Sequence, residues 1–181
     1  MARPRPELSP LEAEGAVSDG AVRRHASASA VAVDADGPLL GALFLGPSGA
    51  GKSDLVLRLI DGCPWRRARL VADDQVLIGT EDGPLLMRPP DALHGTLEVR
   101  GVGLLSFEPA TPTALTAVFD LVAAPERLPE PKTVEIVPGA PPTPLFALSP
   151  FEASAPAKVR AALRTVFCGQ SREGAHHEGL S

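Results

Sequence analysis

Cysteine is scarce in this sequence, tyrosine is absent, and no long apolar run occurs. The two cysteines, Cys63 and Cys168, lie far apart in the chain, which excludes a disulfide framework and a cysteine-based metal site. We therefore expect reduced thiols and a cytoplasmic protein. No stretch approaches the length of a membrane span, and the N-terminal segment MARPRPELSPLEAEGAVSDG lacks the apolar core of a secretion signal.

An excess of positive charge is also missing. The net charge of the chain is −5, whereas a nucleic-acid-binding protein would present a basic face. The chain does have length and hydrophobicity, because 44% of its 181 residues are hydrophobic, which is enough for one domain with a substantial core. No internal repeat is visible. Length and composition therefore predict one globular domain, and its function has to be inferred from sequence motifs.

Composition divides the chain into a body and two ends. Residues 1–22 are rich in Pro, Ala, Glu and Ser and lack hydrophobic periodicity, so we expect a disordered arm. Residues 169–181 have a similar composition, and we expect a disordered tail. The adjacent His176 and His177 are interpreted as a solvated pair in this tail, because no further metal ligands lie nearby in the sequence. The single predicted domain then spans residues 23–168.

Between the two ends, the pattern is mostly that of β-strands. Apolar and β-branched runs bounded by Gly, Pro and Asp predict strands at 29–33, 39–45, 70–72, 76–78, 85–87, 97–107, 114–122 and 133–137. The first two are expected to form a hairpin around the turn residues 34–38. Helices are predicted at 54–60 and 155–167. The prolines at 138, 141, 142 and 144 predict an irregular or edge segment.

A glycine-rich loop follows the strand 39–45 and precedes the first helix. The loop fits the phosphate-binding pattern G-x-x-x-x-G-K-[ST], with a strand before it and a helix after it as that pattern requires. Its members are Gly46, Pro47, Ser48, Gly49, Ala50, Gly51, Lys52 and Ser53. The glycines let the backbone wrap an anion with its N–H groups pointing inward, and the helix N-terminus adds a positive dipole end. We expect Lys52 to bind the outer phosphates of a nucleotide and Ser53 to ligate Mg²⁺.

An acidic pair, Asp73 and Asp74, follows the apolar strand 70–72. Such a strand can lie beside the phosphate loop, so the pair has the character of a Walker B element. Successive residues of an extended strand point to opposite faces. If both aspartates are extended, one faces the phosphates and takes part in the reaction while its neighbour orients it or binds the loop. The sequence does not say which of the two is the base. The pair also follows the first helix too early for an ordinary nucleotide-kinase layout.

Glu98 and Arg100 are two residues apart in the alternating segment 97–107, so they would share one face of a strand. Glu98 would then hold Mg²⁺ and Arg100 would neutralise charge on a transferring phosphoryl group. A surface ion pair accounts for the same spacing equally well. His25 precedes the first predicted strand. Because that strand forms a hairpin with 39–45, the end next to His25 lies near the phosphate loop, which follows 39–45. A lone histidine is more often a surface or structural residue.

These segments resemble the C-terminal catalytic domain of the HPr kinase/phosphorylase family, bacterial enzymes that phosphorylate a serine of the phosphocarrier protein HPr. The resemblance rests on GPSGAGKSDL at 46–55, RLVADDQV at 69–76 and LEVRGVGLL at 97–105. The last segment is similar to the family's signature and is the most specific of the three. The segment HASAS, which begins at His25, resembles the family's His-containing strand. The resemblance covers about residues 23–168, as in the short form of the family that lacks the usual N-terminal domain.

The resemblance implies an α/β fold, a mixed sheet with a P-loop, built on the nucleotide-binding core that is similar in HPr kinase and phosphoenolpyruvate carboxykinase. It implies that Lys52 and its loop bind ATP and that Ser53 and Glu98 hold Mg²⁺. One of Asp73 and Asp74 would accept the proton of the incoming serine, with His25 and Arg100 around the transferred phosphate. It also implies an HPr-type partner of the phosphotransferase system and a homo-oligomer, possibly a hexamer, because full-length members are hexameric.

The sequence departs from the family in one region. The family carries a Pro-x-Pro-Lys stretch and a later Gly-Arg-Asn, which are associated with substrate handling and dephosphorylation. Here the corresponding segments are PGAPPTPL at 138–145 and SPFEASAPAK at 149–158, and neither basic motif is present. The expected activity is therefore the kinase direction. Two alternatives remain open: a P-loop kinase that acts on another protein or a small molecule, and a nucleotide-gated regulatory module.

Overall fold

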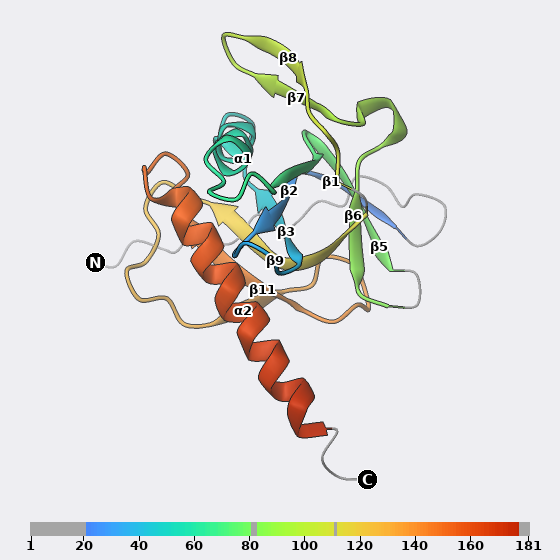
Figure 1. The fold of residues 1–181 in the computed structure, drawn as a ribbon, viewed down its shortest axis with the longest axis vertical. Coiled ribbons are helices and arrows are strands. Elements are labelled where there is room, and N and C mark those ends of the chain that lie inside the picture. The colour runs from blue at the N-terminus through green and yellow to red at the C-terminus, as the bar shows by residue number, and fades with distance from the viewer. Residues whose placement is uncertain (1–20, 81–82, 111, 178–181) are drawn as a thin grey trace, which may run out of the picture.

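A computed structural model describes residues 21–80, 83–110 and 112–177. The chain forms a mixed α/β fold in which most strands join one sheet (Figure 1). The strands follow each other across the sheet in the order β1-β5-β6-β9-β3-β2-β4, and β11 lies beside β9 with β10 on its far side. Their bounds are β1 Val22–His25, β2 Ser27–Ala32, β3 Leu39–Leu45, β4 Arg69–Ala72, β5 Gln75–Thr80, β6 Leu85–Arg88, β9 Thr113–Leu121, β10 Lys132–Val134 and β11 Thr143–Leu148.

A second, two-stranded sheet projects from the body as a hairpin (Figure 1). Its strands are β7 Thr96–Val99 and β8 Gly103–Ser106, preceded by the short helix η1 Asp91–Leu93. The remaining helices are α1 Lys52–Asp61 and α2 Ala155–His177. No helix in the described part of the chain is long and apolar enough to cross a membrane.

Side chains at alternate positions of the central strands belong to two separate apolar layers. On β3, Leu40, Ala42 and Phe44 face α1 and α2, while Leu43 and Leu45 face the opposite layer, which is formed largely by β1, β5 and β6. This is the period of two expected for a strand buried on both faces. The sheet therefore curls so that its β1-β5-β6 part covers the face that the helices leave open.

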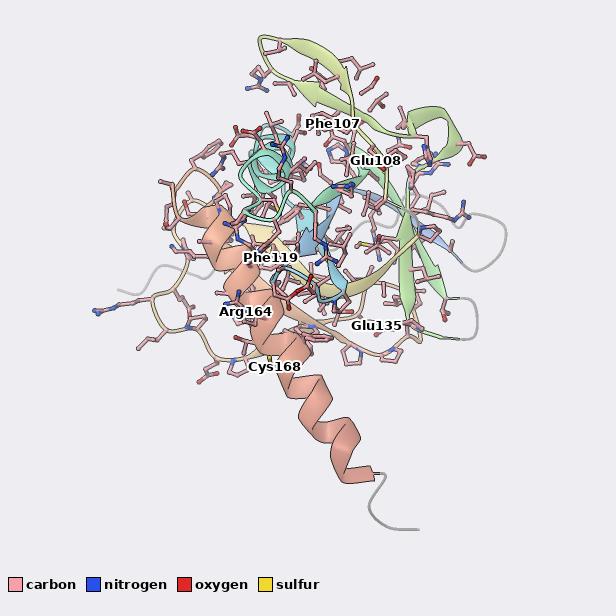
Figure 2. The ribbon with its side chains drawn as sticks, viewed as in Figure 1. Phe107, Glu108, Phe119, Glu135, Arg164 and Cys168 are labelled. Carbon is pink, nitrogen blue, oxygen red and sulfur yellow. The ribbon has the colours of Figure 1, made fainter. Side chains whose placement is uncertain are left out.

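Helix α2 closes the first layer. Its buried residues Ala155, Val159 and Leu163 recur at helical spacing and pack with α1 and the sheet. Beneath it, the ring of Phe119 stacks on Phe44 and on Phe146, each at a centroid distance of 5.6 Å. Arg164 donates a hydrogen bond to the Val33 carbonyl at 2.5 Å. Figure 2 labels Phe119 and Arg164 on this face of the molecule.

The hairpin of β2 and β3 and the first helix agree with prediction. Ser27 of β2 pairs with Phe44 of β3 in antiparallel register, so the start of β2 lies beside the end of β3. The loop from Gly46 leaves the sheet at that point and leads into α1. This arrangement brings the N-terminal end of β2 next to the glycine-rich loop.

Four local predictions are wrong. The segment 97–107 is not one strand, because a turn at 100–102 with positive-φ glycines at 101 and 103 separates β7 from β8. The proline-containing segment is irregular at 138, 141 and 142, as predicted, but Pro144 lies in β11, which pairs with β9 and β10 and so is not an edge strand. The strand expected at 133–137 ends at Val134, and the buried Ile136 and Val137 lie in a turn.

The fourth correction concerns the C-terminal end. Helix α2 continues to His177, through most of the segment whose composition predicts a disordered tail. Residues 178–181 and the arm 1–20 lie outside the described residues. The boundary at the N-terminal end also moves slightly, because β1 begins at Val22 and pairs with β5.

The close approach of β3 to β9 can be tested by a substitution at Gly41. A Cβ atom at this position would lie 2.1 Å from the Ala114 carbonyl oxygen and 2.7 Å from Met87 Cε, so Gly41→Ala forces β3 and β9 apart. We expect it to lower the free energy of unfolding by about 1–3 kcal/mol in chemical denaturation.

Gly169 is the matched control for that substitution. It lies in α2 with no atom within 4 Å of an added Cβ, so Gly169→Ala should raise stability by about 0.5–1 kcal/mol through helix propensity. Equal effects of the two substitutions would contradict the close approach of β3 and β9.

Candidate active site

The site lies at two breaks between consecutive strands, one between β1 and β2 and the other between β4 and β5. Strand β2 pairs with β4, and β1 pairs with β5. Ala26 separates β1 from β2, and Asp73 and Asp74 separate β4 from β5, so the two breaks lie opposite each other. The Ala26 N–H bridges them by donating to the Asp74 carbonyl at 3.2 Å. The aspartates are thus fixed at a bend that is hydrogen-bonded across the sheet.

Asp74 is not extended, which corrects the alternation expected for the acidic pair. Its φ is +65°, and the Gln75 N–H donates to the Asp73 carbonyl at 2.8 Å. An i→i+2 hydrogen bond around a left-handed residue is a γ-turn of the rare, strained kind. Strain of this type persists where the surrounding structure enforces it, and it is concentrated at functional sites.

The turn gives the two carboxylates different surroundings. Asp73 is buried and 8% exposed. Its Oδ1 accepts hydrogen bonds from Ser27 Oγ at 2.6 Å and Ser53 Oγ at 2.8 Å, and its Oδ2 accepts from the Glu98 N–H at 3.3 Å. The side chain of Asp74 is 67% exposed, and its Oδ1 lies 3.2 Å from His25 Nδ1. One aspartate therefore organises the site, and the other faces the solvent beside a histidine.

The glycine-rich loop has the backbone that its sequence predicts. Gly46, Gly49 and Gly51 have φ values of +148°, +80° and +89°, which side chains other than glycine rarely adopt. The loop closes on itself, because the Ala50 N–H donates to the Pro47 carbonyl at 3.1 Å. Helix α1 begins at Lys52 directly after Gly51, so its N-terminal N–H groups and positive dipole end face the same region as the loop.

Lys52 is buried and 7% exposed. Its Nζ donates to the carbonyls of Gly46 at 2.8 Å and Pro47 at 3.0 Å. Burial lowers the pKa of Lys52, while the negative charges of Asp74 and Asp73 act in the opposite direction. The ammonium group is therefore positioned by its own loop and lies within the electrostatic influence of both aspartates.

All of these groups face one cavity of about 530 Å³. Among its lining residues are the side chains that the sequence singled out from four separate segments. These are His25, Lys52, Ser53, Asp73, Asp74, Glu98 and Arg100, together with Ser48, Gly49 and Gly51 of the loop. The structure thus brings the predicted residues together. Their chemical roles remain predictions.

Glu98 and Arg100 both line the cavity, but not as two residues on one face of a strand. Glu98 is on β7, whereas Arg100 is the first residue of the turn before β8. They do not share a strand face, and the strand-spacing explanation for the pair is wrong. Both are exposed, and both line the cavity because the hairpin leans beside α1, with which β7 is in contact.

Magnesium suits the oxygen donors of this cavity. Mg²⁺ is usually held by one or two carboxylates together with substrate phosphates and water. Ser53 Oγ and the Asp73 carboxylate lie 2.8 Å apart, and Glu98 lines the same space. No cluster of three or more His, Cys, Asp or Glu side chains suited to a metal occurs among the described residues, so a metal here would depend on the nucleotide for further ligands.

Sequence reasoning missed two residues of the site. Ser27 is fully buried on β2 and holds Asp73, but a serine in an apolar strand carries no motif. Phe151 follows β11, lines the cavity and is 70% exposed. Its position could not be predicted because the preceding strand was not recognised.

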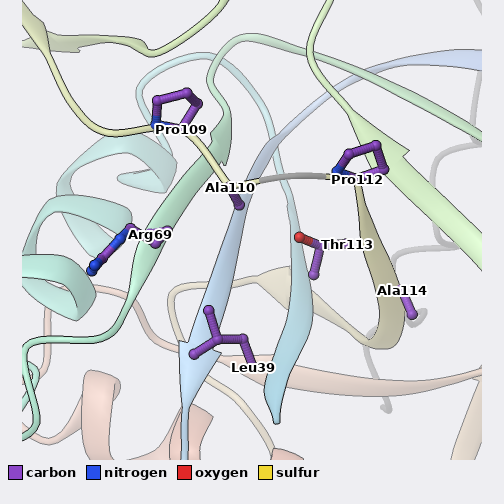
Figure 3. Close-up of a pocket in the computed structure, with 7 residues that line it drawn as sticks. All are labelled: Leu39, Arg69, Pro109, Ala110, Pro112, Thr113 and Ala114. Atoms are coloured by element: carbon purple, nitrogen blue, oxygen red, sulfur yellow. The ribbon is translucent and has the colours of Figure 1, made fainter.

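A second cavity, of about 310 Å³, lies at the start of β4, the opposite end of that strand from Asp73, and is lined by Leu39, Arg69 and residues 109–110 and 112–114 (Figure 3). Its one charged lining residue, Arg69, is already engaged, because Nε lies 3.2 Å from Glu108 Oε2 and Nη1 donates to the Arg66 and Ala68 carbonyls. It lacks the convergent polar groups of the larger cavity.

The Ser27–Asp73 hydrogen bond yields a stability test. Ser27→Ala removes a donor to a buried carboxylate, so we expect a loss of about 1.5–3 kcal/mol in the free energy of unfolding, measured by denaturant titration. Ser29 is the matched control. It is equally buried on β2 but donates to the neutral Arg69 carbonyl at 2.9 Å, so Ser29→Ala should cost about 0.5–1.5 kcal/mol. A larger loss from the Ser29 variant would contradict this account.

The family and the relatives that this chain resembles are described as HPr kinases. Residues 22–110 match the family described as HPr Serine kinase C-terminal domain. A protein of Clostridium perfringens (strain SM101 / Type A) named HPr kinase/phosphorylase is 47% identical over 66 residues, 36% of this chain and 20% of that protein. The protein of the same name from Clostridium beijerinckii is 47% identical over 75 residues, 41% of this chain and 23% of that protein. The chain thus spans about a fifth of the length of these curated relatives.

A solved structure extends the likeness beyond the matched segment. The structure described as the Hpr(Ser) kinase/phosphatase from Coxiella burnetii aligns with a TM-score of 0.67 at 23% sequence identity. The alignment covers 88% of this chain and 99% of that one. At this identity the comparison establishes the fold, and its coverage exceeds the segment 22–110 that the family model matches.

Proposed function

We propose, from the match of residues 22–110 to the family described as HPr Serine kinase C-terminal domain, that the chain is an ATP- and Mg²⁺-dependent serine kinase. Its proposed acceptor is an HPr-type phosphocarrier protein of the phosphotransferase system. The observation that carries the proposal is the hydrogen bond from Ser53 of the phosphate loop to Asp73, with Asp74 exposed beside it. This geometry supports a site that can hold a nucleotide and also deprotonate an acceptor.

Asp74 is the proposed base. It is exposed, so a serine of another protein can reach it, and His25 Nδ1 at 3.2 Å orients its carboxylate. In the proposed reaction the serine O–H proton passes to Asp74 as the serine oxygen bonds to the γ-phosphorus of ATP. The bond from that phosphorus to the β–γ bridging oxygen breaks, and ADP leaves.

The other groups bind and neutralise charge. The N–H groups of the loop and of the N-terminus of α1 donate to the phosphate oxygens, and Lys52 and Arg100 supply positive charge to the cavity. Ser53, Asp73 and Glu98 are the residues that would hold Mg²⁺. When bound, the ion neutralises charge on the β- and γ-oxygens. Asp73 is buried and its carboxylate already accepts three hydrogen bonds, which favours the exposed Asp74 as the base.

The loop between β11 and α2 supports a preference for the kinase direction. In this loop, Pro150, Phe151 and Glu152 occupy the region where the family's basic motifs are expected, and its residue on the cavity wall is Phe151. Capture of inorganic phosphate for the reverse reaction would need cationic groups that this loop does not place among the lining residues. A homo-oligomer and a cytoplasmic location are part of the proposal.

The direct test is phosphorylation of a purified HPr-type protein with ATP and Mg²⁺. We expect phosphoserine on the acceptor by mass spectrometry, and loss of transfer with Lys52→Ala, because the phosphates lose their buried cation. Phosphoserine-HPr incubated with inorganic phosphate should remain phosphorylated. Strong transfer by Lys52→Ala would overturn the site. A different dominant band in a cell extract labelled with radioactive ATP would instead favour a kinase for another substrate.

The two aspartates can be separated by matched substitutions. Asp74→Asn should lower the transfer rate by about 10²–10⁴-fold and leave the affinity for a non-hydrolysable ATP analogue unchanged. Asp73→Asn should weaken binding of the Mg²⁺ complex of that analogue, because the site loses the negative charge that would help to hold the ion. Single-turnover kinetics and calorimetry distinguish the two effects. The opposite pattern would assign the base to Asp73.

A further inference from the structure

A solvent-exposed phenyl ring lies against the phosphate loop. Phe151 is 70% exposed. A Cβ atom added at Gly51 would lie 2.9 Å from two carbons of its ring, so the ring covers the backbone of the loop at this position. Phe151 also lines the cavity that contains Lys52 and the two aspartates. Among the described lining residues, it carries the sole phenyl ring.

The backbone on both sides of the ring is fixed. Arg58 of α1 donates from Nη2 to the Pro150 carbonyl and from Nη1 to the Glu152 carbonyl at 3.4 Å. The same guanidinium pairs with Asp54 at 2.8 Å. The Glu152 carboxylate accepts from Lys158 of α2, and this hydrogen bond lowers the pKa of Glu152. An arginine of the helix that begins at the phosphate loop therefore holds the ring next to that loop.

Scattered exposed apolar side chains are common and need no function. Phe151 differs from them because its two chain neighbours are bonded to α1 and its ring borders an anion-binding loop. An aromatic side chain whose backbone is held in place loses little conformational entropy when a ligand covers it. The position therefore favours a flat, apolar ligand group that is close to bound phosphates.

A nucleotide has such a group. The loop and Lys52 would bind the phosphates and leave the base free, and a base presents two π-faces that stack on aromatic rings. Leu57, which precedes Arg58 on α1, adds apolar surface to the same cavity. We propose that Phe151 is the stacking surface for the base of the nucleotide whose phosphates bind at residues 46–53. This inference rests on the proposed function and adds the residue that reads the base.

The test compares two ligands that share the phosphates and differ in the base. The Mg²⁺ complexes of a non-hydrolysable ATP analogue and of inorganic tripolyphosphate are titrated into the full chain by calorimetry. Phe151→Ala should weaken binding of the ATP analogue by about five- to 150-fold, the range for loss of one base–aromatic stack, and leave tripolyphosphate binding within about twofold. Phe151→Trp should retain the affinity, and Phe151→Leu should lose most of it, because it keeps apolar bulk without a ring.

Controls separate this inference from the function on which it rests. Leu128 is 88% exposed and does not line the cavity, so Leu128→Ala should change neither affinity. Equal weakening of both ligands by Phe151→Ala would mean that the ring acts through the loop and would overturn the stacking role. Unchanged nucleotide affinity with a raised KM for the acceptor protein would overturn it in favour of acceptor contact. If the unaltered chain binds neither ligand, the proposed function fails as well.

Discussion

The carboxylate of Asp73 is the point on which the site depends. It accepts hydrogen bonds from a serine of β2, a serine at the start of α1 and a main-chain N–H of β7. These three segments are distant in sequence, and each belongs to a different part of the cavity: the start of β2 next to His25, the phosphate loop and the projecting hairpin. Hydrogen bonds to a buried charge are stronger than neutral ones, and leaving one unmade is costly. A single buried acidic side chain therefore sets the relative positions of the groups around the cavity.

The γ-turn at Asp74 follows from the same bend. Because β4 leads into β5 with the peptide of Asp74 hydrogen-bonded to Ala26, two consecutive aspartates leave the strand in different directions. Asp73 points inward to three donors, and Asp74 points toward the solvent and His25. A regular strand would also separate their side chains, but to opposite faces of the sheet. The bend keeps both at one cavity with different exposure, which two distinct roles require.

Much of this arrangement could be predicted from local patterns, and the failures have physical causes. Strand β3 and the phosphate loop were predictable because their glycines and apolar residues respond to local geometry. The turn at Arg100 was not, since its glycines at 101 and 103 fit an alternating strand as well as a hairpin tip. Strand β11 was hidden by Pro144, which tertiary pairing tolerates between β9 and β10. Ser27 and Phe151 have no sequence signature, because each acts through contacts with residues far along the chain. Helix α2 runs past its apolar face to His177, where composition suggested no structure.

The internal hydrogen bonds of Lys52 bear on selectivity. Its ammonium group already has two carbonyl partners, Gly46 and Pro47, at 2.8 and 3.0 Å. An ammonium group has three N–H donors, so these carbonyls occupy two of them and fix the direction of the third. A phosphate oxygen that lies along that direction keeps both carbonyl bonds, whereas an anion elsewhere recruits the lysine only by breaking one of them. The loop therefore selects its ligand by where the oxygens lie and not by negative charge alone.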